Sequence, residues 1–284
     1  VAVLTNLSRD HLDYHKDMDA YAATKARLFF WPNLKYVVLN LDDILGIELL
    51  QQLVRKSVKV IGYGFKKSVA NTASEQCQMI YGSNLKVDLQ GVEFDIEYQG
   101  NREKLKADLV GKFNAVNLLA VVAGLLASGV AFTDAVHALR YVQPIAGRME
   151  KFGGGDQPVV IVDYAHTPDA LEKVLMTLRE MLNASRKVKE LNSVTGRLYC
   201  VLGCGGERDK GKRQLIGEVA TRFADEVIFT SDNPRSEDPC DIINDMVVGV
   251  NSNNYQTEIN RELAIYQSIS SAVTGDIVLI AGKR

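Results

Sequence analysis

The stretch Val159-Val160-Ile161-Val162-Asp163-Tyr164-Ala165-His166-Thr167-Pro168-Asp169 decides the fold of the second half of the chain. Its first four residues form a short β-branched apolar run that ends at Asp163, which predicts a buried strand over 159–163. Thr167 then offers an N-cap hydroxyl, Pro168 suits the first helical position, and Asp169 complements the positive end of the helix dipole. The stretch therefore predicts one βα unit.

The same order of strand and helix continues to the C-terminus. Strands are expected over 198–202, 226–230 and 276–281, with helices over 212–223, from Asp238 onward and over 262–272. Strands separated by helices favour a mostly parallel, doubly wound sheet, whose ligands bind at the carboxyl ends of the strands. Three polar clusters directly follow such strands, at 163–166, 203–213 and 232–235. We predict that they form one site.

The first half of the chain has a different pattern. Strands are predicted over 36–40 and 58–63, helices over 44–55, 114–126 and 132–139, and antiparallel hairpins from the alternation at 87–89 and 92–98. The composition changes at 144–148 and again at the three glycines 153–155. We therefore expect an α/β protein of two domains, over 1–148 and 149–284, the first with a small antiparallel β subdomain.

Composition restricts the classes of function. The 284 residues are 46% hydrophobic and 24% charged, with a formal charge of −2, which does not favour non-specific binding to nucleic-acid phosphates. No apolar run approaches the roughly 20 residues that span a bilayer. Cys200 and Cys204 lack the second pair or nearby histidine of a zinc site, and four cysteines are too few for a disulfide framework. We expect a cytoplasmic protein with reduced thiols that binds neither nucleic acid nor membrane.

The segment 203–213, Gly-Cys-Gly-Gly-Glu-Arg-Asp-Lys-Gly-Lys-Arg, comes near two nucleotide-binding motifs and satisfies neither. A P-loop needs Ser or Thr where Arg213 stands, and a dinucleotide fingerprint needs its third glycine where Arg208 stands. What remains is a glycine-rich turn that opens a helix and carries several cations, which suits a phosphate or carboxylate.

Asp232-Asn233-Pro234-Arg235 brings a carboxylate, an amide and a guanidinium together in four residues. Arginine binds a carboxylate with two parallel hydrogen bonds while aspartate binds an ammonium group, so the set suits a zwitterionic amino acid. An ordinary Asx-Pro turn with surface charges is the alternative.

Two features near the N-terminus are candidates for chemistry. His11 and His15 are four residues apart, but Leu12 stands where the zinc-protease motif needs glutamate. Lys25 lies among alanines and threonine, where a lysine gains little unless it is paired or modified, although a lysine that snorkels to solvent is a common alternative.

Taken together, these segments resemble the Mur ligase family, in the branch that adds meso-diaminopimelate. The matching segments occur in family order, at 5–15, 114–117, 147–150, 163–169, 203–206, 208–213 and 232–235. The resemblance implies a partial P-loop-type central ATPase domain followed by a Rossmann-like C-terminal domain that binds an amino acid. It also implies an ATP-dependent amide-bond ligase, in which the substrate carboxylate becomes an acyl phosphate that the incoming amine attacks.

The resemblance also assigns cofactors and residues. ATP is assigned to Asn114, Asn117, Arg148, Asp163 and His166. Mg²⁺ and catalysis are assigned to His11 and to Lys25, the latter as the carbamate formed with CO₂. Meso-diaminopimelate is assigned to Arg208, Asp232, Asn233, Pro234, Arg235 and Gly282. Arg235 is the discriminating residue, because diaminopimelate ends in a second amino-acid centre whose carboxylate binds a guanidinium, whereas the bare ammonium of lysine is repelled.

The acceptor substrate implied is UDP-N-acetylmuramoyl-L-Ala-D-Glu, in peptidoglycan synthesis, which serves cell-wall biogenesis, cell shape and cell division; the enzyme is expected to be a cytoplasmic monomer. Two departures from the family bear on activity. Its ATP-binding P-loop and UDP-binding domain are expected before Val1, and its Gly-His-Glu after Lys283 is not present, because Arg284 ends the chain. We expect a partial sequence that does not ligate by itself.

Two kinds of alternative stay open, and a third is rejected. One is a lysine-adding Mur ligase or a folylpolyglutamate-type synthetase, in which Arg235 would not select diaminopimelate over lysine. A non-catalytic α/β protein would bind the amino acid without ATP. A nicotinamide oxidoreductase is disfavoured by Arg208.

Overall fold

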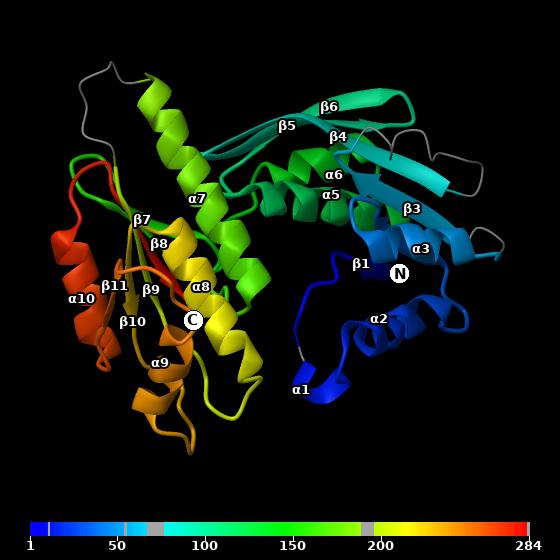
Figure 1. The fold of residues 1–284 in the computed structure, drawn as a ribbon. Helices are drawn as coiled ribbons and strands as arrows, with labels where there is room; N and C mark the ends of the chain where they lie inside the picture. The colour runs from blue at the N-terminus through cyan, green and yellow to red at the C-terminus, as the bar shows by residue number, and fades with distance from the viewer. Residues whose placement is uncertain (11, 54–55, 67–76, 189–195, 283–284) are drawn as a thin grey trace. The chain divides into compact units, whose positions relative to one another are not determined.

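The computed structural model describes residues 1–10, 12–53, 56–66, 77–188 and 196–282, and the chain divides into two compact units. Unit 1 comprises residues 1–8 and 14–143, and unit 2 comprises residues 9–13 and 144–284. Each unit is built around one six-stranded sheet with helices packed on it (Figure 1).

The sheet of unit 1 joins parallel and antiparallel strands. Its strands, in spatial order, are β1 (Ala2–Leu4), β2 (Tyr36–Asn40), β3 (Lys59–Gly64), β4 (Cys77–Asp88), β5 (Gly91–Tyr98) and β6 (Asn101–Ala107). β1 to β4 run parallel, whereas β5 and β6 form the predicted antiparallel hairpins. Because the long β4 pairs with β3 near its start and with β5 along its length, the antiparallel strands extend the parallel sheet.

The helices of unit 1 cover both faces of this sheet. They are α2 (Met18–Ala26), the 3₁₀ helix η1 (Arg27–Phe30), α3 (Ile44–Leu53), α5 (Lys112–Ala127) and α6 (Phe132–Leu139), whereas the boundary between the two units falls within the short α1 (Leu12–His15). Alternate side chains of β2 face opposite sides, so Val37 and Leu39 pack in the core that includes α3, while Val38 packs in the core that includes α5. The predicted helix over 132–139 is confirmed in its bounds.

Polar contacts fix the segment that follows β1. The carboxylate of Asp43 accepts hydrogen bonds from the amides of Leu45 and Leu7, at 3.0 Å each, and so joins the first turn of α3 to this segment. The buried Tyr63 hydroxyl donates to the Leu4 carbonyl at 3.0 Å. Burial raises the pKa of Tyr63, and the nearby Asp43 carboxylate raises it further, so the hydroxyl remains a donor.

Unit 2 has the predicted, mostly parallel sheet. Its strands, in spatial order, are β11 (Tyr255–Thr257), β10 (Glu226–Phe229), β9 (Leu198–Leu202), β12 (Ile277–Ala281), β8 (Val159–Asp163) and β7 (Glu150–Gly153), and only β7 runs antiparallel to its neighbour. α7 (Pro168–Val188) and α8 (Gly211–Phe223) cover one face and α10 (Arg261–Ser271) the other (Figure 1). α9 (Pro239–Val247) packs beside α8.

The helix starts of unit 2 form as their sequences predict. The Thr167 hydroxyl accepts from the Ala170 amide at 3.3 Å, and Pro168 is the first residue of α7. Asp238 caps α9 through the Cys240 amide at 2.7 Å. The parallel pairing of β8, β12, β9 and β10 places the segments after these strands at one edge of the sheet.

We expect Asp43→Ala to lower the free energy of unfolding of unit 1 by about 1–2 kcal/mol, because the change removes a helix cap and leaves the Leu7 amide without its acceptor. Urea denaturation followed by circular dichroism measures this. Asp134→Ala, in the exposed first turn of α6, is the control and should change stability by less than about 0.5 kcal/mol. Equal losses in both variants would contradict the role given to Asp43.

Candidate functional site

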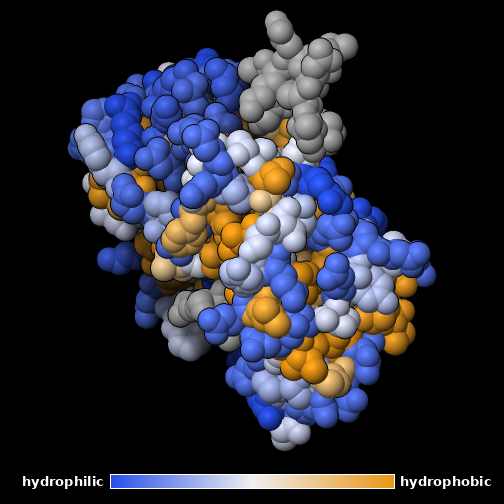
Figure 2. Space-filling view, turned by 90° about the vertical axis from the view of Figure 1, so that its left-hand side faces the viewer, coloured by the Kyte–Doolittle hydropathy of each residue, from blue (hydrophilic) through white to orange (hydrophobic). Residues whose placement is uncertain are grey.

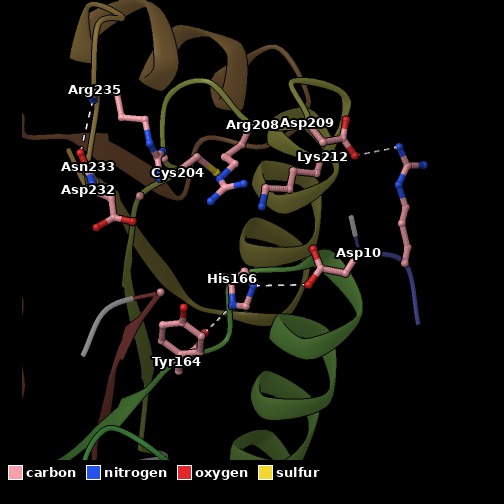
Figure 3. Close-up of a pocket in the computed structure, with 14 residues that line it drawn as sticks. Asp10, Tyr164, His166, Cys204, Arg208, Asp209, Lys212, Asp232, Asn233 and Arg235 are labelled. Atoms are coloured by element: carbon pink, nitrogen blue, oxygen red, sulfur yellow. Dashed lines mark hydrogen bonds and ion pairs between the residues drawn. The ribbon is translucent and has the colours of Figure 1, made fainter. Parts of the chain in front are cut away.

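The three polar clusters of unit 2 meet at one pocket of about 230 Å³ (Figure 3). Tyr164 and His166 reach it from the segment after β8, and Gly282 from the segment after β12. Residues between Gly203 and Lys212 reach it after β9, and Asp232, Asn233 and Arg235 after β10. The convergence of the clusters, predicted from the order of strands and helices, is therefore confirmed.

The charges around the pocket favour an anionic or zwitterionic ligand. Its lining contains four cationic side chains, Arg9, Arg208, Lys212 and Arg235, and three carboxylates, Asp10, Asp209 and Asp232. Two of the carboxylates have partners in the protein, because Arg9 donates to Asp209 at 3.4 Å and His166 Nε2 lies 3.6 Å from Asp10. A ligand with more than one carboxylate and at least one ammonium group complements this set.

The loops that carry Arg208 and Arg235 lie against each other. The Gly206 amide donates to the Asn233 carbonyl at 2.9 Å, and the Arg235 guanidinium donates to the Gly206 carbonyl. A Cβ atom on Gly206 would collide with the Pro234 carbonyl oxygen, so only glycine permits this approach. Pro234 thus shapes the pocket through its backbone and does not line it.

Asp163, at the end of β8, is buried and organises its surroundings. Its two carboxylate oxygens accept from the amides of Met149, at 2.9 Å, and Ala165, at 2.8 Å. Burial raises the pKa of Asp163, and the two amide hydrogen bonds oppose that rise. Close by, the guanidinium of Arg148 lies over the Tyr164 ring, 4.4 Å from its centroid. The cation is therefore placed over an aromatic face, where a cation–π interaction favours it.

His166 lies in the pocket with the side chains assigned to the amino acid. Its Nδ1 is 2.9 Å from the Tyr164 carbonyl oxygen, and its Nε2 is 3.6 Å from the Asp10 carboxylate (Figure 3). Asn114 and Asn117, predicted to bind ATP as well, lie in unit 1, three residues apart near the start of α5. The side-chain amide of Asn114 donates to the Val110 carbonyl at 2.8 Å.

Lys25 lies on α2, where its ammonium is 3.4 Å from the Asn6 carbonyl oxygen and 5.0 Å from the centroid of the Tyr21 ring. A carbonyl and an aromatic face are partners for a cation. His11, predicted to share a metal with Lys25, lies outside the described residues. Among the residues that the structure describes, no three His, Cys, Asp or Glu side chains form a metal-binding group. An ammonium group cannot ligate Mg²⁺, so the assignment of the metal to Lys25 concerns its carbamate form and stays a prediction.

Sequence reasoning missed four pocket residues, Arg9, Asp10, Asp209 and Lys212, as ligand-facing groups. A signal was present for each, since Arg9 and Asp10 directly precede His11, and Asp209 and Lys212 lie inside the cationic glycine-rich segment.

Comparisons with known proteins match the whole length of the chain. The model of the Mur ligase middle domain matches residues 1–125, and that of the Mur ligase glutamate ligase domain matches residues 147–284. The UDP-N-acetylmuramoyl-L-alanyl-D-glutamate--2,6-diaminopimelate ligase of Nitrosomonas europaea is 58% identical over 285 residues, covering 100% of this chain and 54% of that protein. The ligase of the same name from Chromobacterium violaceum is 43% identical over 282 residues, covering 99% of this chain and 53% of that protein. The chain thus spans about half the length of the curated relatives it matches.

Solved structures agree with these matches. A UDP-N-acetylmuramoyl-L-alanyl-D-glutamate--2,6-diaminopimelate ligase aligns with a TM-score of 0.59 at 37% identity, covering 99% of this chain and 54% of the other. MurF from Acinetobacter baumannii aligns with a TM-score of 0.72 at 15% identity, covering 100% and 56%, a likeness that concerns the fold alone.

Thiol labelling tests whether the side chain of Cys204, in the wall of the pocket, is closed to solvent. Cys77, Cys200 and Cys204 are buried, whereas Cys240 is exposed. Cys204 lines the pocket. Burial raises the pKa of the Cys200 and Cys204 thiols to about 12. We expect Ellman's reagent at pH 8 to modify one thiol in the folded chain and four in denaturant. Cys240→Ser should abolish the native reaction. A second fast thiol, removed by Cys204→Ser, would show that the wall is open.

Proposed function

The chain belongs to the Mur ligase family, and we propose that it forms part of an ATP-dependent ligase that adds meso-diaminopimelate to UDP-N-acetylmuramoyl-L-Ala-D-Glu in peptidoglycan synthesis. The observation that carries the proposal is the pocket of unit 2, where Arg208 and Arg235 from two loops converge beside Asp232 and Asn233. The sequence identity between this chain and ligases named for the addition of 2,6-diaminopimelate supports the proposal.

The chemistry of the pocket matches the amino acid. Meso-diaminopimelate carries two carboxylates and two ammonium groups, so two guanidiniums on separate loops, with a carboxylate on one of these loops, complement it. We assign the carboxylates to Arg208 and Arg235, and an ammonium group to Asp232, with Asn233 as a polar partner. Gly282, whose φ is 87°, lies at the pocket wall and permits a close approach of backbone to ligand.

The nucleotide is assigned to groups of both units. We propose that residues 1–148 contribute part of the ATP-binding domain and residues 149–284 the amino-acid-binding domain. Asn114 and Asn117 would contact the nucleotide from α5, Arg148 its phosphates, and Asp163, with His166 near it, the ribose. ATP supplies the phosphoryl group that turns a poorly electrophilic carboxylate into an acyl phosphate. Arg148 would contribute a cation that the Tyr164 ring helps to position.

Mg²⁺ binding is assigned to His11 and to carbamylated Lys25, where the ion would offset negative charge. The family resemblance supports this assignment.

We propose that the protein is a cytoplasmic monomer. Among the described residues, no helix has the length and apolar character that crossing a bilayer requires. The face in Figure 2 shows hydrophobic residues in patches separated by hydrophilic ones.

Calorimetric titration with meso-diaminopimelate and with L-lysine tests the substrate. We expect the chain to bind meso-diaminopimelate in preference to lysine, and Arg235→Lys to weaken diaminopimelate binding on the order of tenfold to a hundredfold, because a charge-assisted pair of hydrogen bonds is lost. Arg222→Lys is the matched control, since Arg222 is exposed and pairs with Glu172 away from the pocket. The assignment would be wrong if the chain bound lysine as tightly as meso-diaminopimelate. It would also be wrong if Arg235→Lys kept the same preference for meso-diaminopimelate over lysine.

The carbamate is tested by ¹³C NMR with labelled bicarbonate. We expect a carbamate carbonyl signal that disappears in Lys25→Gln and persists in Lys35→Gln, in which an exposed lysine is replaced. A signal retained in Lys25→Gln would refute the modification at this site.

A further inference from the structure

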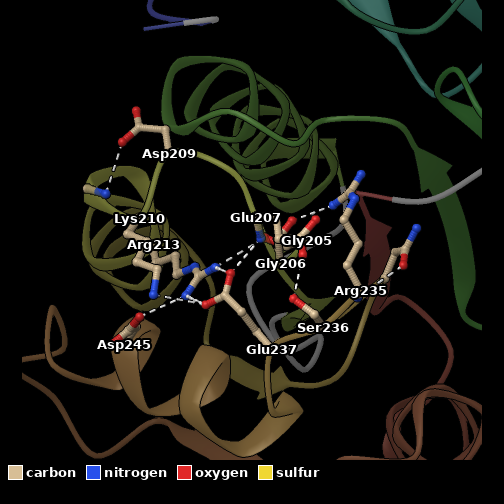
Figure 4. A network of polar contacts seen from close by, with 12 residues as sticks. Gly205, Gly206, Glu207, Asp209, Lys210, Arg213, Arg235, Ser236, Glu237 and Asp245 are labelled. Carbon is tan, nitrogen blue, oxygen red and sulfur yellow. Dashed lines mark hydrogen bonds and ion pairs between the residues drawn. The ribbon is translucent and has the colours of Figure 1, made fainter. Parts of the chain in front are cut away.

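Behind the pocket, one buried arginine joins the two loops that carry Arg208 and Arg235 (Figure 4). Arg213, on α8, is 1% exposed. Its Nη1 and Nη2 donate to the two carboxylate oxygens of Glu237 at 3.0 and 2.8 Å, and Nη1 also donates to Asp245 at 2.8 Å. A buried guanidinium requires such pairing, because an unpaired charge in the interior is strongly destabilising.

Glu237 connects this arginine to the loop over 203–210, hereafter loop A. Its carboxylate accepts from the Glu207 amide and lies 3.1 Å from the Lys210 ammonium. Arg213 itself reaches the Gly205 carbonyl at 3.4 Å. The hydrogen bonds from Arg213, followed by that from the Glu207 amide, lower the pKa of Glu237 to about 2. Glu237 therefore stays charged at neutral pH.

Glu237 belongs to the second loop, over 231–238, hereafter loop B. Loop B also meets loop A through the Arg235 side chain, which donates to the Gly206 carbonyl, and through the Ser236 hydroxyl, which contacts the Glu207 carboxylate. Glu207 and Arg235 both have left-handed backbone conformations, with φ of 54° and 51°. Non-glycine residues adopt this conformation at a cost, so surrounding contacts must hold it.

We propose that the Arg213–Glu237 pair is a positioning device that clamps loop A to loop B and thereby sets the spacing of Arg208 and Arg235. Neither Arg213 nor Glu237 lines the pocket, so the pair acts through the residues that do. The effect on ligand binding rests on the function proposed above for that pocket, whereas the clamp itself is a property of the free protein.

The clamp has a consequence for selectivity. Arg208 is on loop A and Arg235 on loop B, so a ligand with two carboxylates engages both loops, whereas lysine, with one carboxylate, engages one arginine. A misplacement of about 1 Å can cost on the order of a hundredfold in a positioned complex. Loosening the clamp therefore weakens binding of meso-diaminopimelate more than binding of lysine, and the ratio of the two affinities falls.

A merely structural role predicts a different result. If the pair only stabilised unit 2, its loss would lower Tm and leave the ratio of affinities unchanged. Arg179 and Asp225 form a matched pair for comparison, with a contact of 3.0 Å between α7 and the turn before β10, and neither lines the pocket. Asp225→Asn is the control for Glu237→Gln, since both changes replace a carboxylate by its amide.

The experiment measures hydrogen exchange, ligand binding and Tm in the 284-residue chain and its variants. Glu237→Gln should accelerate amide exchange in loops A and B, with β8 as the internal reference. It should weaken meso-diaminopimelate binding at least about tenfold, and lysine binding less. Arg213→Met/Glu237→Leu serves where the single variant folds poorly, because replacing a buried ion pair by apolar residues often preserves stability. It should show the same faster exchange and lower ratio.

The outcomes separate the clamp from the function. The clamp would be overturned if Glu237→Gln and the double variant left both the amide exchange of the loops and the ratio of affinities unchanged. It would also be overturned if Asp225→Asn changed them equally. Faster exchange in both loops with a lower ratio supports it. If the wild-type chain bound no meso-diaminopimelate, the proposed function would fail, and loop exchange alone would then decide whether Arg213 and Glu237 hold the loops together.

Discussion

The pocket depends on the close contact of two backbones. Gly206 and Pro234 approach so closely that any side chain at position 206 would collide with the Pro234 carbonyl. This contact brings the loop after β9 against the loop after β10, and the hydrogen bond from Gly206 to Asn233 fixes their register. The parallel sheet supplies the common edge, but glycine decides how near the two cationic loops lie.

Electrostatics then determines what the pocket can hold. Cationic side chains outnumber carboxylates around it, and one carboxylate is already matched by Arg9. Behind the pocket, the buried Arg213 is neutralised by Glu237 and Asp245, so its charge is satisfied internally. The charges available to a ligand are therefore those of the pocket wall, and they complement a molecule with several carboxylates and ammonium groups.

Much of the fold could be predicted from local pattern. The strands over 159–163 and 198–202 and the helix over 132–139 agree with the structure in their bounds, because each is a continuous apolar run or an amphipathic segment with clear ends. β7 and β11 were not predicted, since both are short edge strands whose side chains are mostly exposed and lack an alternating pattern. β6 was predicted only as the second strand of a hairpin and was given no bounds, because its first half is polar and exposed.

The sequence by itself determined the order of strands and helices, the residue types of the three polar clusters and the family to which they belong. These follow from local periodicity, turn chemistry and motif spacing, which operate over a few residues. Tertiary structure alone decided that His166 meets Asp10 and that Arg213 is paired with Glu237, 24 residues away. Such pairs depend on how separate loops are brought together by strand pairing and burial, and no short-range pattern in a sequence records that.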